Sequence, residues 1–251
     1  MRGAPKLAGN LLVVPVPSAD TASTPARENL VVAIDGPSGS GKSTVARRVA
    51  AALGLRYLDT GAMYRAVTWW ALEQGVDLAD TERVAQLAQD IPLTMGEDPA
   101  EPTVVVGGTD IGAAIRTSDI SAVVSAVATN LGVRAELVAR QQAVARAGGV
   151  VIEGRDITTV VAPDAPVRVL LIADEAVRLA RRAREVHGTD DSVAVDATRD
   201  QVVRRDADDS TVASFHEAAD GVDVVDSSLL SLDETVDAVL ALVEKRTGVR
   251  A

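Results

Sequence analysis

The sequence predicts an α/β fold in which a parallel sheet is covered by helices on both faces. Short runs of β-branched and aliphatic residues alternate along the chain with helical segments, an order that favours parallel strands joined by crossover helices. The chain has 251 residues and is 47% hydrophobic, which is enough for a substantial core. We therefore expect one large α/β unit.

The individual elements follow in chain order. Residues 30–34 form an apolar run closed by Asp-Gly-Pro, which predicts a buried strand. A helix is expected over residues 42–53, where Val45, Val49 and Leu53 share one face and Gly54 follows as a stop signal. The remaining predicted core elements are a helix over 61–74, strands over 149–152, 167–172 and 222–225, and a last helix over 232–243.

The middle of the chain has a different pattern. Glycines and prolines divide residues 91–111 into short segments, 91–95 and 103–106, which predicts a small antiparallel insert. Residues 118–146 then return to a helical pattern, and we expect two helices broken near Gly132.

Composition excludes several classes of function. Asp plus Glu outnumber Lys plus Arg by 36 to 25, a net charge of −11, so we expect no nucleic-acid partner and no binding to an anionic membrane. The chain has no cysteine and two histidines, which rules out disulfides, thiolate zinc sites and cysteine nucleophiles.

The N-terminal residues 1–28 are expected to be a flexible tail before a domain over 29–251. Residues 18–28 are small and polar, and the apolar run before them is interrupted by Pro15 and Pro17. That run is too short for a signal peptide or a membrane span. We expect a cytoplasmic monomer.

The strongest local signal is a phosphate-binding loop between the first predicted strand and helix. Residues 36–43 fit the pattern G-x-x-x-x-G-K-[ST], in which backbone N–H groups and a helix N-terminus surround phosphate oxygens. Lys42 should reach the β- and γ-phosphates, and the Ser43 hydroxyl should bind Mg²⁺. We expect ATP with Mg²⁺, bound by Gly36, Pro37, Ser38, Gly39, Ser40, Gly41, Lys42, Ser43 and Thr44.

A phosphate-binding loop does not by itself identify the second substrate. A GTPase would need an Asn-Lys-x-Asp motif, which the sequence lacks. Three segments bring arginines to candidate positions: Asp59 to Arg65 at a helix start, Val150 to Asp156 at a strand end, and a helix on which Arg178, Arg181 and Arg182 share one face. Each also has a plain structural explanation: a Thr60 helix cap with a surface arginine, an ion pair, and a solvated helix face.

Taken in order, these motifs resemble bacterial cytidylate kinases, of the P-loop nucleoside monophosphate kinase family. The resemblance rests on Ile-Asp-Gly-Pro-x-Gly-x-Gly-Lys-Ser, then Leu-Asp-Thr-Gly-Ala-Met-Tyr-Arg, then Glu-Gly-Arg-Asp. It implies transfer of the ATP γ-phosphate to CMP or dCMP by a P-loop NTPase core over 29–76, 116–173 and 206–251, with a nucleoside-monophosphate-binding insert over about 77–115 and a lid over about 174–205.

The resemblance also implies residue roles. Thr60, Arg65 and Arg155 would hold the acceptor phosphate, Ser125, Arg134 and Asp156 would read cytosine, and Asp209 would lie with Arg205 near the sugar and phosphates. Catalytic charge would come from Lys42, Arg155, Arg181, Arg182 and Arg205. The sequence departs from the family pattern at Val212, where an arginine is usual, and at His216-Glu217, where Pro-Leu often stands.

Such a reaction needs no general base. A phosphate monoester is already largely dianionic near pH 7, so catalysis would consist of positioning and electrostatic clamping. Two alternatives remain at this point. One is another P-loop small-molecule kinase of the adenylate or shikimate type, and the other is a non-enzymatic module whose interactions depend on a bound nucleotide.

Overall fold

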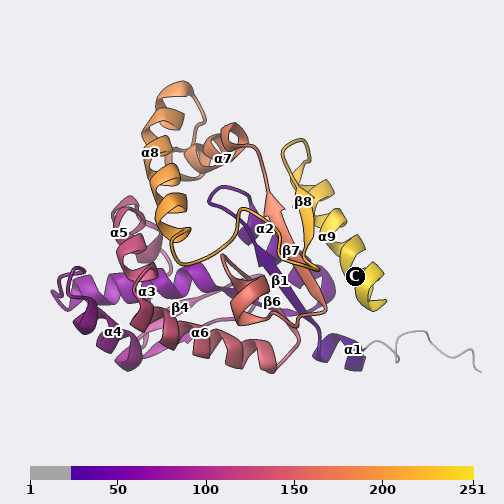
Figure 1. The fold of residues 1–251 in the computed structure, drawn as a ribbon, viewed down its shortest axis with the longest axis horizontal. Coiled ribbons are helices and arrows are strands. Elements are labelled where there is room, and N and C mark those ends of the chain that lie inside the picture. The colour runs from indigo at the N-terminus through magenta and orange to yellow at the C-terminus, as the bar shows by residue number, and fades with distance from the viewer. Residues whose placement is uncertain (1–23) are drawn as a thin grey trace, which may run out of the picture.

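The computed structural model describes residues 24–251 and confirms the predicted α/β fold (Figure 1). Its central sheet has five parallel strands in the order β2-β6-β1-β7-β8. The strands are β1 (Val31–Asp35), β2 (Arg56–Asp59), β6 (Val150–Gly154), β7 (Val167–Ile172) and β8 (Asp223–Asp226). Because β1 lies in the middle, the loop that follows it opens at the centre of the sheet edge.

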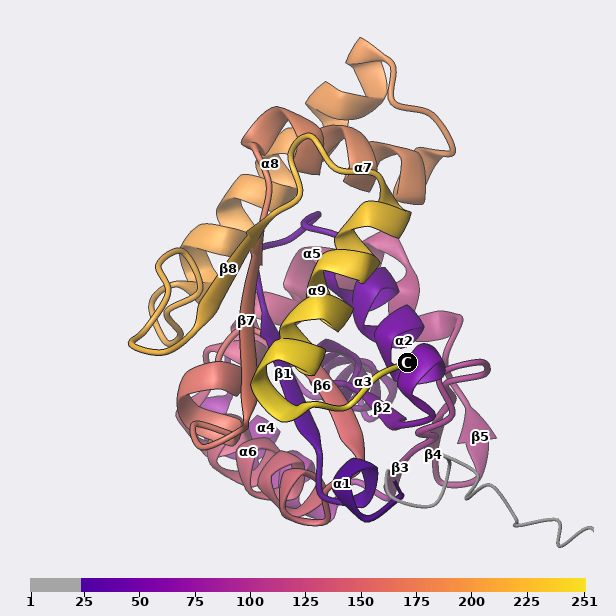
Figure 2. The same ribbon diagram turned by 90° about the vertical axis from the view of Figure 1, so that its right-hand side faces the viewer.

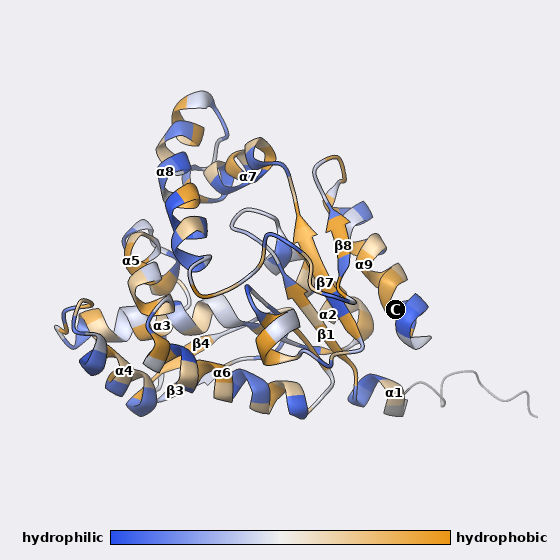
Figure 3. Cartoon of the chain, viewed as in Figure 1, coloured by the Kyte–Doolittle hydropathy of each residue, from blue (hydrophilic) through white to orange (hydrophobic). Residues whose placement is uncertain are grey.

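Helices pack on both faces of the sheet, and each face has its own hydrophobic cluster. On one face, Val32 and Ile34 of β1 pack with α2 (Lys42–Leu53) and α9 (Leu232–Thr247) (Figure 2). On the other face, Val31 and Ala33 pack with α3 (Thr60–Glu73), α5 (Ser118–Ala128) and α6 (Leu131–Arg146). The alternation follows from the period of two along a strand, and the central strands are apolar along their length (Figure 3).

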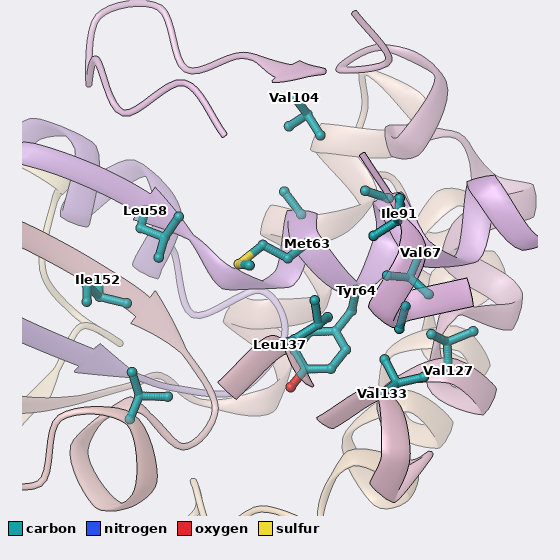
Figure 4. Close-up of a cluster of buried hydrophobic side chains, with 14 of the residues drawn as sticks. Leu58, Met63, Tyr64, Val67, Ile91, Val104, Val127, Val133, Leu137 and Ile152 are labelled. Atoms are coloured by element: carbon teal, nitrogen blue, oxygen red, sulfur yellow. The ribbon is translucent and has the colours of Figure 1, made fainter. Parts of the chain in front are cut away.

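Figure 4 shows part of this second cluster. Met63 points from α3 toward Leu58 of β2 and Ile152 of β6, and all three side chains are buried. This packing fixes the start of α3 against the strand ends, where the site described below lies.

The insert contains the antiparallel sheet predicted from its turns, together with a helix that the sequence analysis missed. Its strands are β3 (Leu93–Met95), β4 (Val104–Val106) and β5 (Thr109–Asp110). The missed helix is α4 (Thr81–Asp90), which Asp80 caps by accepting a hydrogen bond from the Arg83 N–H group. The buried residues of α4 are Val84, Leu87 and Ala88, whose spacings of three and four are typical of an amphipathic helix.

The break between α5 and α6 lies slightly before the predicted position at Gly132. Asn130 caps α6 by accepting hydrogen bonds from the N–H groups of Gly132 and Val133. Gly132 belongs to the first turn of α6, where a Cβ atom would lie 2.6 Å from the Ala85 side chain of α4. The glycine therefore permits close packing of two helices and does not end one.

Two helices complete the fold beyond the carboxyl ends of the strands: α7 (Glu175–His187) and α8 (Ser192–Asp209). They pack against each other and lie together at one end of the molecule (Figures 1 and 2). Within residues 24–251, no single helix is long and apolar enough to cross a membrane; the bent pair α5 and α6, at 96° to each other, meets the criterion only when taken together.

The N-terminal expectation needs one change. Residues 1–23 lie outside the described residues, but Thr24–Glu28 form the short helix α1, although the whole of 1–28 was expected to be a tail. Arg27 Nη2 donates to the Arg250 carbonyl oxygen at 2.6 Å, and the Leu30 N–H group donates to the Arg27 carbonyl. Helix α1 thus lies before the expected start of the domain at Asn29.

Candidate active site

A cavity of about 250 Å³ lies at the carboxyl ends of β1, β2 and β6. Its walls come from the phosphate-binding loop, the start of α3, the turn after β6, and helices α5 to α8. Eight basic and five acidic side chains line it: Lys42, Arg47, Arg65, Arg116, Arg134, Arg155, Arg182 and Arg205 against Asp59, Glu153, Asp156, Glu185 and Asp209. The cavity is therefore net positive in a chain whose net charge is −11.

The phosphate-binding loop has the backbone that its glycines predict. Gly39 and Gly41 have φ angles of 75° and 87°, which side-chain-bearing residues rarely adopt. A Cβ atom on Gly39 would lie 2.4 Å from the Arg178 carbonyl oxygen, so α7 packs directly on the loop. The Lys42 ammonium donates to the Pro37 carbonyl at 3.2 Å, and α2 begins at Lys42.

Glu153 at the end of β6 contacts the residue expected to bind metal. The Ser43 hydroxyl donates to Glu153 Oε1 at 2.7 Å, and the Tyr57 hydroxyl donates to the same oxygen at 3.4 Å. Burial raises the pKa of Glu153 to about 7, and the neighbouring Asp59 charge adds to the rise. Burial also lowers the pKa of Lys42 to about 7, with the charge of Arg155 acting in the same direction. Sequence analysis did not select Glu153 because its contact with Ser43 joins distant parts of the chain.

The start of α3 forms the next wall of the cavity. Asp59, and not Thr60, caps this helix, because Asp59 Oδ1 accepts from the Ala62 N–H group at 2.8 Å. The Thr60 hydroxyl instead donates to the Glu153 carbonyl at 2.8 Å, which joins α3 to β6. Arg65 lies 3.3 Å from Asp59 and lines the cavity, and Arg116 approaches the same carboxylate at 3.7 Å. The expectation of a Thr60 helix cap was therefore wrong. Arg65 is also not the surface arginine of that explanation, because it lines the cavity beside Asp59.

Arg155 is held from several directions at the centre of the cavity. Its Nη1 atom donates to the Gly36 carbonyl at 2.9 Å, and its Nε atom lies 3.3 Å from Asp209. The guanidinium also lies over the ring of Phe215, 5.0 Å from the centroid. Phe215 is fully buried and is the chain's one phenylalanine. These contacts fix the guanidinium at the mouth of β6.

Arg205 and Asp209, both in α8, form a buried pair beside Arg155. Their closest atoms are 3.7 Å apart. Burial lowers the pKa of Arg205 to about 9, and the nearby charges of Arg155 and Arg65 lower it further. Asp209 Oδ1 and Arg205 Nε are buried and have no hydrogen-bond partner among the described residues. The pair therefore has hydrogen-bonding capacity free for a ligand in the cavity.

Part of the cavity lining is apolar or carries a paired acid. Arg134 and Asp156 form an ion pair there, with Tyr64 of α3 beside them. On α5 the lining residues are Ser121, Val124 and Ala128. Ser125 is half-buried on the same helix but is not part of the lining formed by the described residues.

The α7 arginines do not form a solvated face, and they do not all point into the cavity. Arg178 donates to the Ser38 carbonyl at 2.8 Å, and Arg181 donates to the Ser40 carbonyl at 3.2 Å. Arg181 also donates to the Ser227 carbonyl, and it does not line the cavity. Arg182 does line the cavity, whereas Arg184 is exposed. Arg178 and Arg181 thus hold the outer side of the phosphate-binding loop.

Most residues selected from the sequence meet around this one cavity. Those in the lining are Ser38, Gly39, Gly41, Lys42, Ser43, Thr44, Thr60, Arg65, Arg134, Arg155, Asp156, Arg182, Arg205 and Asp209. Those outside it are Gly36, Pro37, Ser40, Ser125 and Arg181. Lining residues that sequence reasoning missed include Arg47, Tyr57, Asp59, Arg116 and Glu153.

The parallel sheet, the phosphate-binding loop at its edge and the arginine-rich cavity define a P-loop nucleotide-binding protein of the kinase type. A family model described as cytidylate kinase matches residues 32–245. The chain belongs to the cytidylate kinase family. It is a phosphotransferase that, as a member of this family, phosphorylates CMP or dCMP with ATP.

This chain covers most of the length of two named relatives and less than half of a third, bifunctional one. It is 46% identical to the cytidylate kinase of Streptomyces griseus subsp. griseus over 223 residues, covering 87% of this chain and 94% of the relative. It is 52% identical to the cytidylate kinase of Cutibacterium acnes over 216 residues, 85% of this chain and 96% of the relative. A bifunctional pantoate ligase/cytidylate kinase of a Synechococcus strain is 44% identical over 231 residues, 90% of this chain and 42% of the relative.

Proposed function

We propose that this enzyme binds ATP with Mg²⁺ at the phosphate-binding loop and binds CMP or dCMP in the remainder of the same cavity, so that the γ-phosphoryl group passes directly between them. The observation that carries the proposal is the composition of the cavity. Its lining combines the loop residues with the Arg134–Asp156 ion pair and several further arginines. The loop residues are Ser38, Gly39, Gly41, Lys42, Ser43 and Thr44, and the further arginines are Arg65, Arg155, Arg182 and Arg205. The direct route needs both substrates side by side, which this arrangement allows.

The ATP-binding part of the cavity has a donor set suited to Mg²⁺. Magnesium in phosphoryl-transfer sites takes one or two protein oxygens and completes its shell with water and phosphate. The Ser43 hydroxyl and the Glu153 carboxylate, already in contact at 2.7 Å, are such a pair. Among the described residues no group of three or more His, Cys, Asp or Glu is arranged for a metal, so Ser43 and Glu153 would hold it together with the ATP phosphates. When bound, Mg²⁺ neutralises charge on the β- and γ-phosphates.

The arginines of the lining would clamp the acceptor phosphate and the transferring group. An oxygen of the acceptor phosphate attacks the γ-phosphorus while the bond to the β-phosphate oxygen breaks, and ADP leaves. All three side chains, Lys42, Arg65 and Arg155, line the cavity; Lys42 would act on the donor phosphates, and Arg65 and Arg155 would act on the acceptor phosphate. Arg182 and Arg205 extend the positive lining from α7 and α8. Fixed positive groups stabilise the charge that spreads over the transferring phosphoryl group.

The part of the cavity lined by Arg134 and Asp156 would recognise cytosine. The 4-amino group of cytosine is a donor, and the Asp156 carboxylate is an acceptor suited to it. Arg134, paired with Asp156, can donate to the acceptor edge of the ring. Ser125 lies on α5, which contributes Ser121, Val124 and Ala128 to the lining, but Ser125 is itself outside the lining. Uracil has a carbonyl where cytosine has the amino group, which would oppose two acceptors.

We further propose that residues 77–115 and 174–205 act as an insert and a lid on a core made from 29–76, 116–173 and 206–251. Arg47 of α2 donates to the carbonyls of Pro99 and Ala100, which supports closure of the insert onto the core. The protein would act as a cytoplasmic monomer, and its net charge of −11 supports the absence of nucleic-acid and membrane partners.

An acceptor panel tests this function. ADP release from ATP and Mg²⁺ is measured with CMP, dCMP, UMP, AMP, GMP and shikimate as separate acceptors. We expect turnover with CMP or dCMP to exceed that with each other acceptor by at least about fivefold in kcat/KM. Preference for AMP or shikimate would overturn the acceptor assignment. ATP binding without any acceptor-dependent turnover would instead indicate a nucleotide-dependent interaction module.

A further inference from the structure

Asp35, the last residue of β1, is a buried acid that the reaction described above does not use. Its exposed fraction is 1%, and it does not line the cavity. Among the described residues no basic side chain pairs with it. Burial raises the pKa of Asp35 to about 6, although its hydrogen bonds lower the pKa. A buried acid without a basic partner destabilises the fold unless its hydrogen bonds compensate.

Those hydrogen bonds all go to one turn. Asp35 Oδ1 accepts from the Ile157 N–H group at 2.8 Å. Asp35 Oδ2 accepts from the Thr158 N–H group at 2.8 Å and from the Thr158 hydroxyl at 2.6 Å. The carboxylate thereby satisfies the first N–H groups of η2 (Ile157–Val161), a single π-helical turn.

This turn directly follows Arg155 and Asp156, the two acceptor-site residues at the end of β6. On the N-terminal side of these two residues, Gly154 packs closely on α3, because a Cβ atom on Gly154 would lie 2.4 Å from the Thr60 hydroxyl. This close packing leaves the backbone before Arg155 little room to move. The chain at 154–158 is therefore held by close packing before Arg155 and by Asp35 after Asp156. Removing the hydrogen bonds to Asp35 would allow the side chains of Arg155 and Asp156 to shift together.

Asp35 also directly precedes the phosphate-binding loop, which starts at Gly36. Arg155 Nη1 donates to the Gly36 carbonyl at 2.9 Å, so the loop and the turn meet at adjacent residues. In the proposed function, the phosphate-binding loop at Gly36 holds ATP, and the turn at Arg155 holds the acceptor. A displacement of about 1 Å between reacting groups can cost about two orders of magnitude in rate.

We propose that Asp35 is a positioning residue that sets the acceptor-binding turn at Arg155 and Asp156 relative to the phosphate-binding loop. The proposal rests on the proposed function, since it assumes that Asp156 reads the base of the acceptor. It assigns to Asp35 no contact with either substrate. Its consequence is that changes at Asp35 alter base selectivity without altering ATP affinity.

The principal variant is Asp35→Asn, which keeps the shape of the side chain. One carboxylate oxygen becomes an NH₂ group, and in either orientation that group faces the N–H group of Ile157 or of Thr158. Two donors then oppose each other in a buried site, so the turn must move. Thr158→Val is a milder variant, because it removes only the hydroxyl bond to Asp35 and keeps both backbone bonds.

Thr235→Val is the matched control. Thr235 is also buried, and its hydroxyl donates at 2.7 Å to the Ser231 carbonyl in α9, away from the cavity. All variants are measured with Mg²⁺ at a temperature at which thermal melting shows them folded. The readouts are the ATP dissociation constant, kcat and KM for CMP, and the ratio of kcat/KM for CMP over UMP.

We expect Asp35→Asn to lower the CMP-over-UMP ratio by at least about fivefold, with a smaller loss in Thr158→Val and an unchanged ratio in Thr235→Val. ATP affinity should stay within about twofold throughout. A ratio within about twofold of the parent in folded Asp35→Asn would overturn the proposal, as would an equal loss in Thr235→Val. If Asp35→Asn does not fold, the ratio in Thr158→Val decides by the same criterion. If the parent itself prefers another acceptor, the proposed function fails, and selectivity for that acceptor decides the role of Asp35.

Discussion

At the scale of single residues, Lys42 has the most demanding role in the proposed transfer. Its ammonium lies in the positive cavity and donates to the Pro37 carbonyl. We expect Lys42→Ala to lower kcat by at least about 100-fold at saturating ATP while the protein remains folded, because the charge acts mainly on the transition state. The matched control is Lys245→Ala, an exposed lysine on α9, which should leave kcat unchanged. A Lys42→Ala enzyme within about threefold of the parent would contradict the assignment.

A second residue-scale prediction concerns Asp156. The mismatch with uracil should cost about 1–3 kcal/mol, so the parent should favour CMP over UMP by about 5- to 150-fold in kcat/KM. In Asp156→Asn the amide can turn its NH₂ group toward the uracil carbonyl, and the preference should shrink while CMP turnover also falls. The structure pairs Asp156 with Arg134, so a purely structural role is the competing explanation. That role predicts equal losses for both acceptors and an unchanged ratio.

Phe215 provides the third prediction. Its ring lies 5.0 Å from the Arg155 guanidinium, a cation–π contact of about 0.5–2 kcal/mol. We expect Phe215→Leu to reduce kcat/KM for CMP by about 2- to 30-fold, with ATP affinity unchanged. Val202→Ala removes buried apolar volume from α8 outside the cavity lining and controls for general destabilisation. If both variants lower kcat/KM equally, the ring contributes only packing.

From the residues alone, the site could be predicted best where it is contiguous in the sequence; Arg134, Arg205 and Asp209 were assigned only through the family resemblance. Most of the phosphate-binding loop, Arg65 and the Arg155-Asp156 pair lie in short motifs at element ends, and they line the cavity. Contacts such as Ser43 with Glu153, or Arg155 with Phe215, join residues far apart in the chain. Such contacts depend on the packing of several elements, and no local pattern encodes them.

At the scale of elements, buried strands were the most predictable part. β1 and β7 are mostly apolar because parallel strands covered on both faces bury most of their residues; the exceptions are Asp35 in β1 and the half-buried Arg168 in β7. The turn at Ile157–Val161 shows the opposite case. All five of its residues are β-branched, which favours a strand, yet they form a π-helical turn held by Asp35. Tertiary hydrogen bonds there override local preference.

Helix α1 leads to an element-scale prediction. The sequence predicts a dispensable tail up to residue 28, whereas the structure places Arg27 against Arg250 and brings the Glu28 carbonyl close to Gly148. The protein that lacks residues 1–28 should therefore have a melting temperature about 2–8 °C lower than the protein that lacks residues 1–23. The reason is that one or two hydrogen bonds of about 1 kcal/mol each are lost with α1. Activity at 25 °C should be the same in both, because α1 lies away from the cavity (Figure 1). Equal melting temperatures would show that α1 adds no stability.

At the scale of the whole molecule, the charge distribution separates two regions. The chain carries −11 overall, but the cavity lining has three more basic than acidic side chains. Burial lowers the pKa of Arg205, and the like charges of Arg155 and Arg65 lower it further. The electrostatic energy of the folded protein without ligand is therefore unfavourable within the cavity, and a bound polyanion would lower it.

That cost leads to the last prediction, which uses inorganic tripolyphosphate without Mg²⁺. A ligand at about 100 times its dissociation constant stabilises the folded state by about 2.7 kcal/mol, so the melting temperature should rise by about 5–10 °C. The rise can be followed by the fluorescence of Trp69 and Trp70, which are outside the cavity lining. Sodium chloride at equal ionic strength should produce a much smaller change, because exposed charges are screened without being bound. The shift should shrink in Lys42→Ala and persist in Lys245→Ala. If chloride reproduced the full shift, the effect would be general screening, and the positive lining would not act as a polyphosphate site.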